Sequence, residues 1–588
     1  MSDLKTVLIN DSRIEDISGE IGFSIMGGPQ QSTFQPQQAN TSSNSSHSWQ
    51  INVPSENIVV DRRILIDTDV QFTITINGGV PIGSTAWNWG NTDGFGPYPL
   101  NSCYLTQNVL INNCGLSVNT QDVIAPLLRM NDQKIHTYYD GWTPSMVDDT
   151  YYNYSDALNA NNNPLGTITN NSMDNKIKPR GSHTITSMTV AYYIADVLQV
   201  GSSNLVSSAL TDKWIITLTT HLTEPLLFLS PFISNPCVSN EAGFLGINNF
   251  SFNFTLDTNL RRVFRSSNAW SSLTTTTYAL SSNFSGASGF SNLRMLMNYL
   301  SVQPSQYAKI SARNVLPLLQ YDRYIAISSN TTTTLPPAVA GVLTSTPFTS
   351  SNIALNQIPD TILIFARIPI SQQNASKSDS FYKIDGISIN FNNVAGILSS
   401  ATPHELWVIS QKAGSSQSWS EFSGQVNKSS ITGLSSTIPT TGSILALSPT
   451  SVFNLPEYLS SSSLGSYNLQ FTLNISNQGS TATNFEIVVI TITSGYITTH
   501  QGTTQSFTGV LNKEMVMSGK SGDGLKGTLA QSDYERLVGG VRDNRGVMNM
   551  MKHFKNRRMG STSGGVMSGG VMSGGMQTVG GRLGKYIK

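Results

Sequence analysis

The alternation in residues 57–77, NIVVDRRILIDTDVQFTITIN, most constrains what this chain can fold into. From Asp61 onward nearly every second residue is apolar: Ile64, Ile66, Val70, Phe72, Ile74 and Ile76. A period of two with many β-branched residues predicts a long strand with one face on a core and the other face polar. The pattern returns at residues 356–370, NQIPDTILIFARIPI, with an Asn, an Asp and an apolar strand in the same order. We therefore expect one β-domain that is built twice.

Other segments recur in the same order in both halves. In each half a strand with a polar turn precedes a short helix, and a proline-containing apolar segment precedes a strand that contains Phe-Thr-Leu. The matched segments are 109–130 with 387–410, 225–232 with 451–458, and 251–259 with 469–477. Because the order is the same, duplication is the interpretation that we favour over chance similarity.

The predicted fold class is all-β, with two consecutive eight-stranded jelly rolls and short helices in the connecting loops. About eight short strands per half, with long connections and little helix, are typical of a two-sheet antiparallel sandwich. One helix is expected over residues 120–130, capped by Asn119 or Thr120 with Asp122 in its first turn. The second is expected after Thr402, with Pro403 at its first position and Glu405 at its third.

Length and composition favour several domains and a weakly charged surface. A chain of 588 residues is too long for one core. Charged residues make up 12% of it, about half of the usual fraction, and 35 basic residues balance 35 acidic ones. The whole chain therefore shows no electrostatic steering toward nucleic acid or a membrane surface. Three Cys without metal-ligand spacing argue against a disulfide framework or a zinc site, and no apolar run is long enough for a membrane span.

We divide the chain into four parts. Residues 1–46 form a flexible N-terminal arm, 47–310 the first jelly roll and 311–510 the second, and 511–588 form a Gly-rich basic tail that is a candidate for proteolytic removal. The N-terminus lacks a charged segment followed by an apolar one, so we expect no signal peptide and a reduced, intracellular place of synthesis.

Four short motifs carry a resemblance to a known family. They are VDRRILI at residues 60–66, NNNPLG at 161–166, PRGS at 179–182 and WSEF at Trp419–Phe422. In this order, within two consecutive sandwiches, the chain resembles the double jelly-roll major capsid proteins of the PRD1–adenovirus lineage, most of all those of virophages and polinton-like viruses. The resemblance implies a homotrimer in which six jelly rolls form a pseudo-hexagonal tile of an icosahedral double-stranded DNA virus shell. It also implies contacts with neighbouring capsomers and with minor capsid or penton proteins.

The tail carries a repeated pattern of an apolar residue, any residue and Gly-Gly. The residues of this pattern are Leu537, Gly539, Gly540 and the following Val541, then Met567, Gly569, Gly570, Met572, Gly574 and Gly575. Gly-Gly suits a narrow substrate cleft, because residues without Cβ let the backbone approach closely. The pattern resembles the sequence cut by the adenovirus-type maturation cysteine protease. We hypothesise removal of the tail after Gly540; the alternative is a Gly-rich linker that matches a loose pattern by accident.

The tail is also basic. From Val541 to the end, nine Lys or Arg residues face one acid, Asp543, which would suit weak contact with DNA.

The sequence gives only weak signals of ligand-binding sites. Asp67 and Asp69 lie on one face of a strand and could bind a cation together with Asp148 and Asp149, but we favour a solvated face. Trp87, Trp89 and the aromatic residues of 138–154 could stack on sugars, although loop packing is the simpler role. The histidines, His47 and His221 among them, are scattered without partner spacing.

No catalytic constellation stands out. The GxGxxG of residues 522–527 lies in a polar tail and not after a strand, so it does not indicate dinucleotide binding. We therefore expect no enzyme, no cofactor and no metal. The favoured function is a major capsid protein of the virion, and the alternative is a secreted or surface β-sandwich that binds glycans as an adhesin does.

Overall fold

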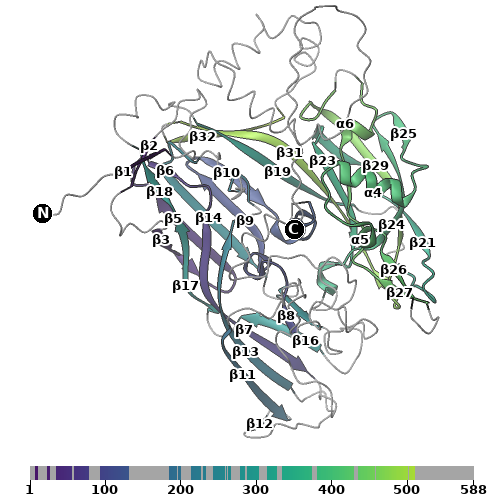
Figure 1. Cartoon of the computed structure of the whole chain (residues 1–588), viewed down its shortest axis with the longest axis horizontal. Helices are drawn as coiled ribbons and strands as arrows, with labels where there is room; N and C mark the ends of the chain where they lie inside the picture. Colours follow the sequence, from purple (N-terminus) through teal and green to yellow (C-terminus); the bar gives the residue numbers. More distant parts are fainter. Residues whose placement is uncertain are drawn as a thin grey trace, which may run out of the picture. The chain divides into compact units, whose positions relative to one another are not determined.

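The computed structural model describes residues 7–10, 23–26, 35–55, 58–77, 93–130, 185–194, 197–199, 213–226, 229–232, 243–257, 260, 263–266, 279–284, 288–302, 314–326, 334–373, 380–429, 435–456, 459–500 and 502–509. The chain divides into two compact units, Met1–Val541 and Arg542–Lys588, and every described residue lies in the first. Within it the strands pair antiparallel, and helices are few and short (Figure 1).

Two sheets form the first half of the fold. The five-stranded sheet has the order β10-β9-β14-β5-β4, and the seven-stranded sheet has the order β12-β11-β13-β7-β17-β3, with β16 also paired to β7. The strands are β3 (Gln35–Gln38), β4 (Thr41–Ser42), β5 (Ser46–Asn52), β7 (Leu65–Asn77), β9 (Tyr104–Ile111), β10 (Cys114–Val118), β11 (Ile185–Ile194), β12 (Val197–Gln199), β13 (Lys213–Pro225), β14 (Asn249–Leu256), β16 (Ala279–Phe284) and β17 (Phe290–Met297).

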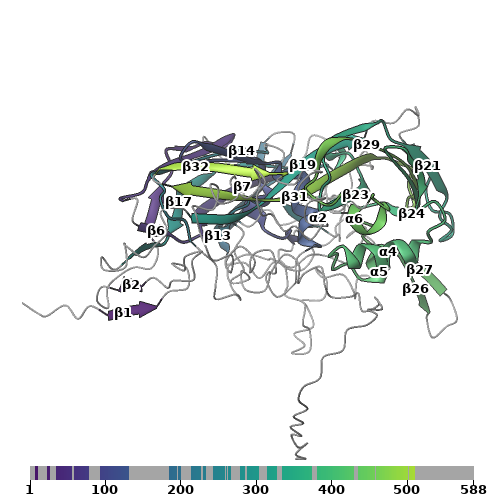
Figure 2. The same ribbon diagram turned by 90° about the horizontal axis from the view of Figure 1, so that it is seen from above.

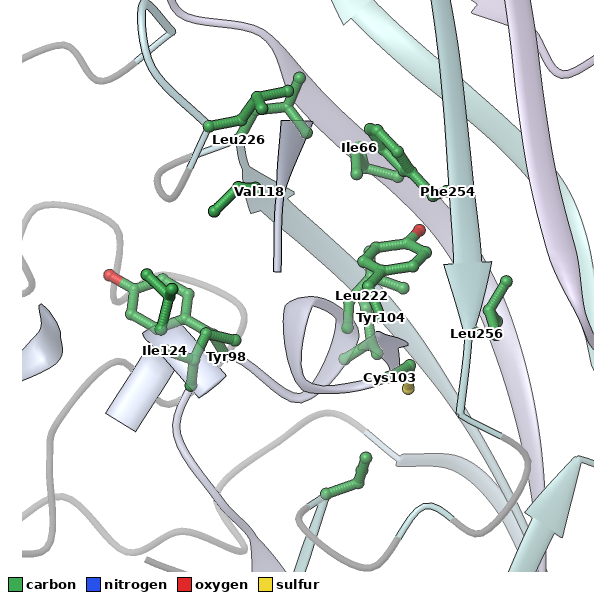
Figure 3. Packing of buried hydrophobic residues seen from close by; sticks show 14 of the residues in the cluster. Ile66, Tyr98, Cys103, Tyr104, Val118, Ile124, Leu222, Leu226, Phe254 and Leu256 are labelled. Carbon is green, nitrogen blue, oxygen red and sulfur yellow. The ribbon is translucent and has the colours of Figure 1, made fainter. Parts of the chain in front are cut away.

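The core of this half lies between the two sheets. Figure 3 shows Ile66 of β7 and Leu222 of β13 with Tyr104 of β9 and Phe254 of β14, so that both sheets contribute side chains. The rings of Tyr104 and Phe254 meet edge to face, with centroids 5.0 Å apart. The predicted alternation along β7 is confirmed, because its even-numbered apolar residues are all buried.

The second half also has two sheets. One has the order β19-β31-β23-β28 with β32 paired to β31, and the other has the order β21-β29-β24-β25 with β22 paired to β29. The strands are β19 (Asn314–Ala326), β21 (Ser345–Thr349), β22 (Ile353–Gln357), β23 (Thr361–Arg367), β24 (Lys383–Phe391), β25 (Val394–Ile397), β28 (Leu445–Leu447), β29 (Leu464–Ser476), β31 (Glu486–His500) and β32 (Thr503–Thr508).

Five strand pairings occur in the same chain order in both halves, which confirms the double jelly-roll fold. They are β5–β14 and β22–β29, β9–β14 and β24–β29, β9–β10 and β24–β25, β7–β13 and β23–β28, and β7–β17 and β23–β31. We call these halves the first roll and the second roll. In this correspondence β7 matches β23, the two strands from which the sequence prediction of a duplication began.

An asparagine turn marks the equivalent hairpins. Asn112 between β9 and β10 and Asn392 between β24 and β25 both have φ of 51°, the left-handed region that Asn tolerates. The Oδ1 atom of Asn112 accepts from the backbone N–H of Asn248 at 2.8 Å, and that of Asn392 accepts from Asn468 at 2.8 Å.

The turns also set the structural register of the two rolls. Phe250 lies opposite Ile111, and Leu469 lies opposite Phe391, next to the respective turns. The Phe-Thr-Leu triplets are therefore offset by two residues, so that Phe252 rather than Phe254 is the counterpart of Phe471.

Helices occupy the connections, as expected, and one follows each hairpin. They are α1 (Pro99–Ser102), α2 (Thr120–Leu128), the 3-10 helix η6 (Ile370–Gln372), α4 (Pro403–Lys412), α5 (Trp419–Phe422) and α6 (Pro449–Val452). The predicted cap of α4 is confirmed, because Thr402 and Glu405 form a reciprocal capping box. Of the two residues predicted to cap α2, Asn119 occupies the N-cap position, but its side chain makes no capping hydrogen bond.

Several predicted boundaries shift. The strand expected over residues 57–77 is interrupted after Val60, and its first part pairs separately. Residues 35–46, which the sequence predicts as part of the arm, contribute β3 and β4 to the sheets of the first roll. The remaining short pairs are β1 (Val7–Asn10) with β2 (Phe23–Met26), β6 (Ile58–Val60) with β18 (Tyr299–Ser301), β8 (Asp93–Phe95) with β15 (Phe264–Ser266), β20 (Thr334–Leu335) with β30 (Thr483–Asn484), and β26 (Gln425–Ser429) with β27 (Ser435–Pro439).

Candidate functional site: the junction of the two rolls and the outer surfaces

Of the two aspartates that are candidates for a cation site, Asp67 forms an ion pair with Arg294 and Asp69 accepts a hydrogen bond from Asn292. The carboxylate of Asp67 accepts from Arg294 Nε at 2.7 Å and from Thr223 Oγ1 at 2.6 Å, and it lies 3.0 Å from His221 Nε2. Only 4% of Asp67 is exposed, so the predicted solvated face is wrong at this position as well. Asp148 and Asp149 lie outside the described residues. Among the residues described, no group of three or more His, Cys, Asp or Glu is suited to hold a metal.

His221 joins both aspartates of β7. Its Nδ1 atom lies 2.8 Å from Asp69 Oδ1, while its Nε2 atom faces Asp67, and Asn292 donates to Asp69 Oδ2 at 2.8 Å. Burial disfavours ionisation of Asp69, but the hydrogen bonds from Asn292 and His221 outweigh it and lower the pKa of Asp69. The cluster therefore ties β13 and β17 to the polar face of β7.

A second buried cluster lies where the first roll meets the second, and it begins at the N-terminal end of α2. Asp122 is fully buried, and its two carboxylate oxygens accept from Arg323 Nη1 of β19 and from Arg367 Nη2 of β23. Arg367 also donates through Nε to Glu486 of β31 at 2.7 Å. Burial opposes ionisation of Asp122, yet the two guanidinium groups keep the pKa of Asp122 below its ordinary value.

The other end of α2 makes a second ionic contact. Arg129 follows the helix and donates through Nε to Glu421 of α5 at 2.6 Å, with 3% and 4% of the two side chains exposed. Its guanidinium lies 5.2 Å from the centre of the Phe381 ring, within the range of a cation–π contact. The Arg129 carbonyl accepts from the backbone N–H of Ser416 at 2.8 Å.

A third contact lies at the asparagine turn of the first roll. Asn112 donates through Nδ2 to Thr504 Oγ1 of β32 at 2.9 Å, and Asn113 Oδ1 accepts from the Thr504 backbone N–H at 2.9 Å. Nearby, Thr499 of β31 donates to the Leu245 carbonyl and Gly502 donates to the Gly246 carbonyl. The second roll is thus held to the first at these three places, and also where the Leu319 backbone N–H of β19 donates to Ser230 Oγ at 2.8 Å.

An apolar core continues through the junction. The large buried cluster that contains Val123, Ile124 and Leu127 of α2 also contains residues of the second roll: Leu316, Leu363, Phe365, Phe381, Ile444, Ala446, Val488 and Ile490. A separate cluster fills the rest of the second roll. The two rolls therefore share buried surface, so we expect them to move as one body rather than as beads on a linker.

Sequence reasoning missed this junction. Asp122 is 201 residues from Arg323 and 245 from Arg367, so no local spacing reveals the contact. The available signal was the arginine inside the apolar strand ILIFAR, because a charge in a buried strand requires a partner.

Several apolar side chains are exposed on the surface. Val197 and Leu198 of β12 are 63% and 49% exposed, Met188 of β11 is 43% exposed, and Val339 and Val342 are each 68% exposed at a tight turn. On the second roll His404 and Trp407 of α4 meet Trp419 of α5, with ring centroids 5.1 to 5.8 Å apart. Figure 2 shows α4 and α5 next to each other. These surfaces are suited to contacts with other molecules.

Other predicted sites lie outside the described residues. These are Trp87, Trp89, residues 138–154, the motifs at 161–166 and 179–182, the GxGxxG at 522–527 and the whole Gly-Gly tail from Leu537 onward. Among the described helices, none is long and apolar enough to span a membrane.

Family models match both rolls. The model described as "Sputnik virophage major capsid protein 1st domain" matches residues 2–300, and "Major capsid protein V20 C-terminal domain" matches residues 321–495. The Sputnik virophage protein named "Putative capsid protein V20" is 25% identical over 547 residues, which cover 91% of this chain and 84% of that protein.

Solved structures show the same fold. The Sputnik virophage structure determined by cryo-EM matches with a TM-score of 0.67 at 23% identity, over 88% of this chain and 96% of that chain. The crystal structure of the mavirus major capsid protein matches with a TM-score of 0.62 at 15% identity, over 83% and 93% of the two chains. The first family model alone spans more than half of the sequence, and the resemblance stated from the sequence is confirmed. The chain therefore belongs to the Sputnik virophage major capsid protein family and is a structural protein of the virion capsid.

Proposed function

We propose that three copies of the chain form a pseudo-hexagonal capsomer, the tile of an icosahedral shell around double-stranded DNA. The observation that carries the proposal is the repetition of one strand order in two rolls that share a buried junction. Three copies around a threefold axis would place six similar lobes in a ring, which a chain with one roll could not do as a trimer. Its role is structural, and we assign it no enzymatic activity.

The surface suits close packing of copies. A chain with 12% charged residues and no net charge repels its own copies little, and exposed apolar groups on β12 and at the Val339–Val342 turn provide contact area. Neighbouring capsomers and minor capsid or penton proteins are the proposed partners at the edges of the tile.

Light scattering coupled to size exclusion tests the trimer. We expect a trimer with a mass of three times 63.6 kDa, about 191 kDa, that does not change on moderate dilution. A stable monomer would contradict the capsomer. A monomer that also binds a glycan array would instead support the adhesin that the sequence left as an alternative.

The tail is proposed to be removed during maturation by a viral cysteine protease. The Gly-Gly pattern supports cleavage after Gly540, before Val541, with later sites after Gly570 and Gly575. Intact mass spectrometry of mature particles should give chains that end at Gly540. Chains that end at Lys588 would contradict the proposal, and the variant Gly539→Val/Gly540→Val should block the cut if the pattern is read by the protease.

Before removal, the basic tail is proposed to contact DNA. The nine basic residues after Gly540 should give weak binding that falls steeply with salt. The matched control is the chain that ends at Gly540, which should lose this binding. Equal retention of DNA by both chains would contradict a role for the tail.

A further inference from the structure

The buried ion pairs at the two ends of α2 stand out in a chain with few charges. Asp122 is fully buried, and Arg367, Arg129 and Glu421 are 4%, 3% and 4% exposed. Each pair crosses from the first roll to the second. A buried ion pair often stabilises a protein no better than apolar residues of similar volume, because desolvating two charges offsets their attraction. Stability alone therefore does not explain why four buried charges lie at this junction.

The geometry of α2 suggests a different role. Asp122 and Arg129 are seven residues apart, which along a helix is about 10 Å. One contact between two bodies leaves them free to rotate about it, whereas two contacts that far apart on a rigid helix allow rotation only about the line that joins them, and the third contact at Thr504 opposes that remaining rotation. Apolar contacts are non-directional, but an arginine fork paired with a carboxylate has a defined direction.

Each ionic contact is itself held from more than one side. The Asp122 carboxylate accepts from arginines on two strands of the second roll, and one of them, Arg367, also pairs with Glu486 at 2.7 Å. Arg129 is fixed by Glu421, by the ring of Phe381 and by a donated hydrogen bond from Nη1 to the Ala125 carbonyl at 3.1 Å.

We propose that these two ion-pair contacts set the angle between the rolls, and that Asp122, Arg367, Arg129 and Glu421 are positioning residues for capsid assembly. A tile with six lobes requires the angle within one chain to match the angle between chains. A small error in that angle, repeated in every copy, would change the curvature of the shell or prevent its closure. The assembly role rests on the proposed capsomer, but the angle can be measured on the isolated chain.

The first test replaces Asp122 together with both of its arginine partners, and among the charges of this cluster it leaves in place only the partly exposed Glu486. The variant Asp122→Leu/Arg323→Met/Arg367→Met should unfold at a midpoint equal to or above that of the wild type. It should nevertheless show a broader distribution of inter-roll angles in cryo-EM images and a loss of closed particles in favour of open or irregular assemblies. The matched control is Asp67→Leu/Arg294→Met, which replaces an ion pair inside the first roll, between the buried Asp67 and the more exposed Arg294, and should leave angle and assembly unchanged.

A conservative variant covers the case in which the triple replacement does not fold. Arg367→Lys keeps the charge but cannot reach Asp122 and Glu486 together, so it should fold and still broaden the angle. Wild-type angles and particles in either folded variant would overturn the inference while leaving the trimer intact. Conversely, a wild-type chain that is monomeric would refute the capsomer, and the angle comparison between variants would still decide the role of the ion pairs.

Discussion

After the paired asparagine turn, each roll continues into a helix, and the two helices are stabilised in different ways. In α2 every residue except Gln121 is buried, its N-terminus has no side-chain cap, and a proline lies inside it at Pro126. In α4 only Leu406 and Ser410 are buried, and Thr402 and Glu405 form a full capping box. The same position in the two rolls thus holds one helix fixed by its neighbours and one helix fixed by its own sequence.

The difference follows from where each helix lies. The first helix is enclosed at the junction, where packing of its buried side chains supplies its stability and the ion pairs of Asp122 and Arg129 hold its two ends in place. The second helix lies on the surface, where local signals must supply more of it. Duplication therefore preserved the order of strands, while the junction between the copies changed the environment of an element that both inherited.

The cores differ as well. The first roll buries Glu224, whose carboxylate accepts from the backbone N–H groups of Leu100 and Asn101 and from Asn101 Nδ2, each at 2.8 Å. Burial raises the pKa of Glu224 to about 7 despite these bonds. Within the described residues of the second roll, the buried carboxylate is Glu421, which is paired with Arg129.

The largest effects should come from equivalent core residues. Phe252→Ala and Phe471→Ala each remove a buried ring at matching positions of β14 and β29, and each should lower the free energy of unfolding by about 3–5 kcal/mol. Chemical denaturation measures both. Thr255→Ala and Asn474→Ala, at exposed positions of the same strands, should change it by under about 0.5 kcal/mol. A large cost in one roll with a negligible cost in the other would break the structural equivalence.

The next largest effect is a pH dependence of the unfolding free energy that comes from Glu224 in the first roll. The pKa of Glu224 is about 7 when folded and 4.5 in its unperturbed state, so its contribution to stability is present below pH 4.5 and is lost as the pH rises through 7. Relative to Glu224→Gln, the wild type should lose about 3 kcal/mol of unfolding free energy between pH 4 and pH 8. Burial lowers the pKa of His47 to about 3, which acts in the opposite sense, but His47 is present in both proteins and its effect cancels. Parallel pH profiles of the two proteins would show that folding does not raise the pKa of Glu224.

Substitution of either turn asparagine by Ala should lower the unfolding free energy, with a larger loss in the first roll. Asn392→Ala places Ala in the left-handed region and removes the hydrogen bond to Asn468, at a cost of about 2 kcal/mol. Asn112→Ala should cost about 1 kcal/mol more, because it also loses the bond to Thr504. The Gly variants, which keep the backbone geometry, should recover part of each loss in thermal unfolding. Equal costs for the two Ala variants would indicate that the contact with β32 adds nothing.

The smallest effect concerns the exposed helix. Thr402→Ala removes the cap of α4 and should lower the unfolding free energy by about 1 kcal/mol. Thr402→Ser keeps the hydroxyl and should stay close to wild type. If the Ala variant were as stable as the Ser variant, α4 would be held by packing as α2 is, and the contrast between the helices would disappear.

Sequence reasoning succeeded where the signal is local. The alternation of β7 reports its buried face directly, and the Thr402–Glu405 spacing located the start of α4, because a capping box involves only neighbouring residues. The Phe-Thr-Leu similarity found the right pair of strands but not their register. A shift of two residues keeps the same face inward, so hydrophobicity cannot distinguish the two alignments.

Prediction from the sequence failed where two interacting residues are distant in the chain. Asp67 has the parity of the polar face, and only the fold brings His221 and Arg294 over it. The junction is the clearest example, because both partners of Asp122 lie on strands of the second roll. Such contacts depend on how two complete domains dock, which no local pattern encodes.

The most direct test of the account is a cryo-EM reconstruction of the purified, unassembled protein. The account predicts a threefold particle with six sandwich lobes, in which two lobes of each chain share one strand order and meet across α2. A particle without threefold symmetry, or two lobes in one chain whose strands follow different orders, would contradict it.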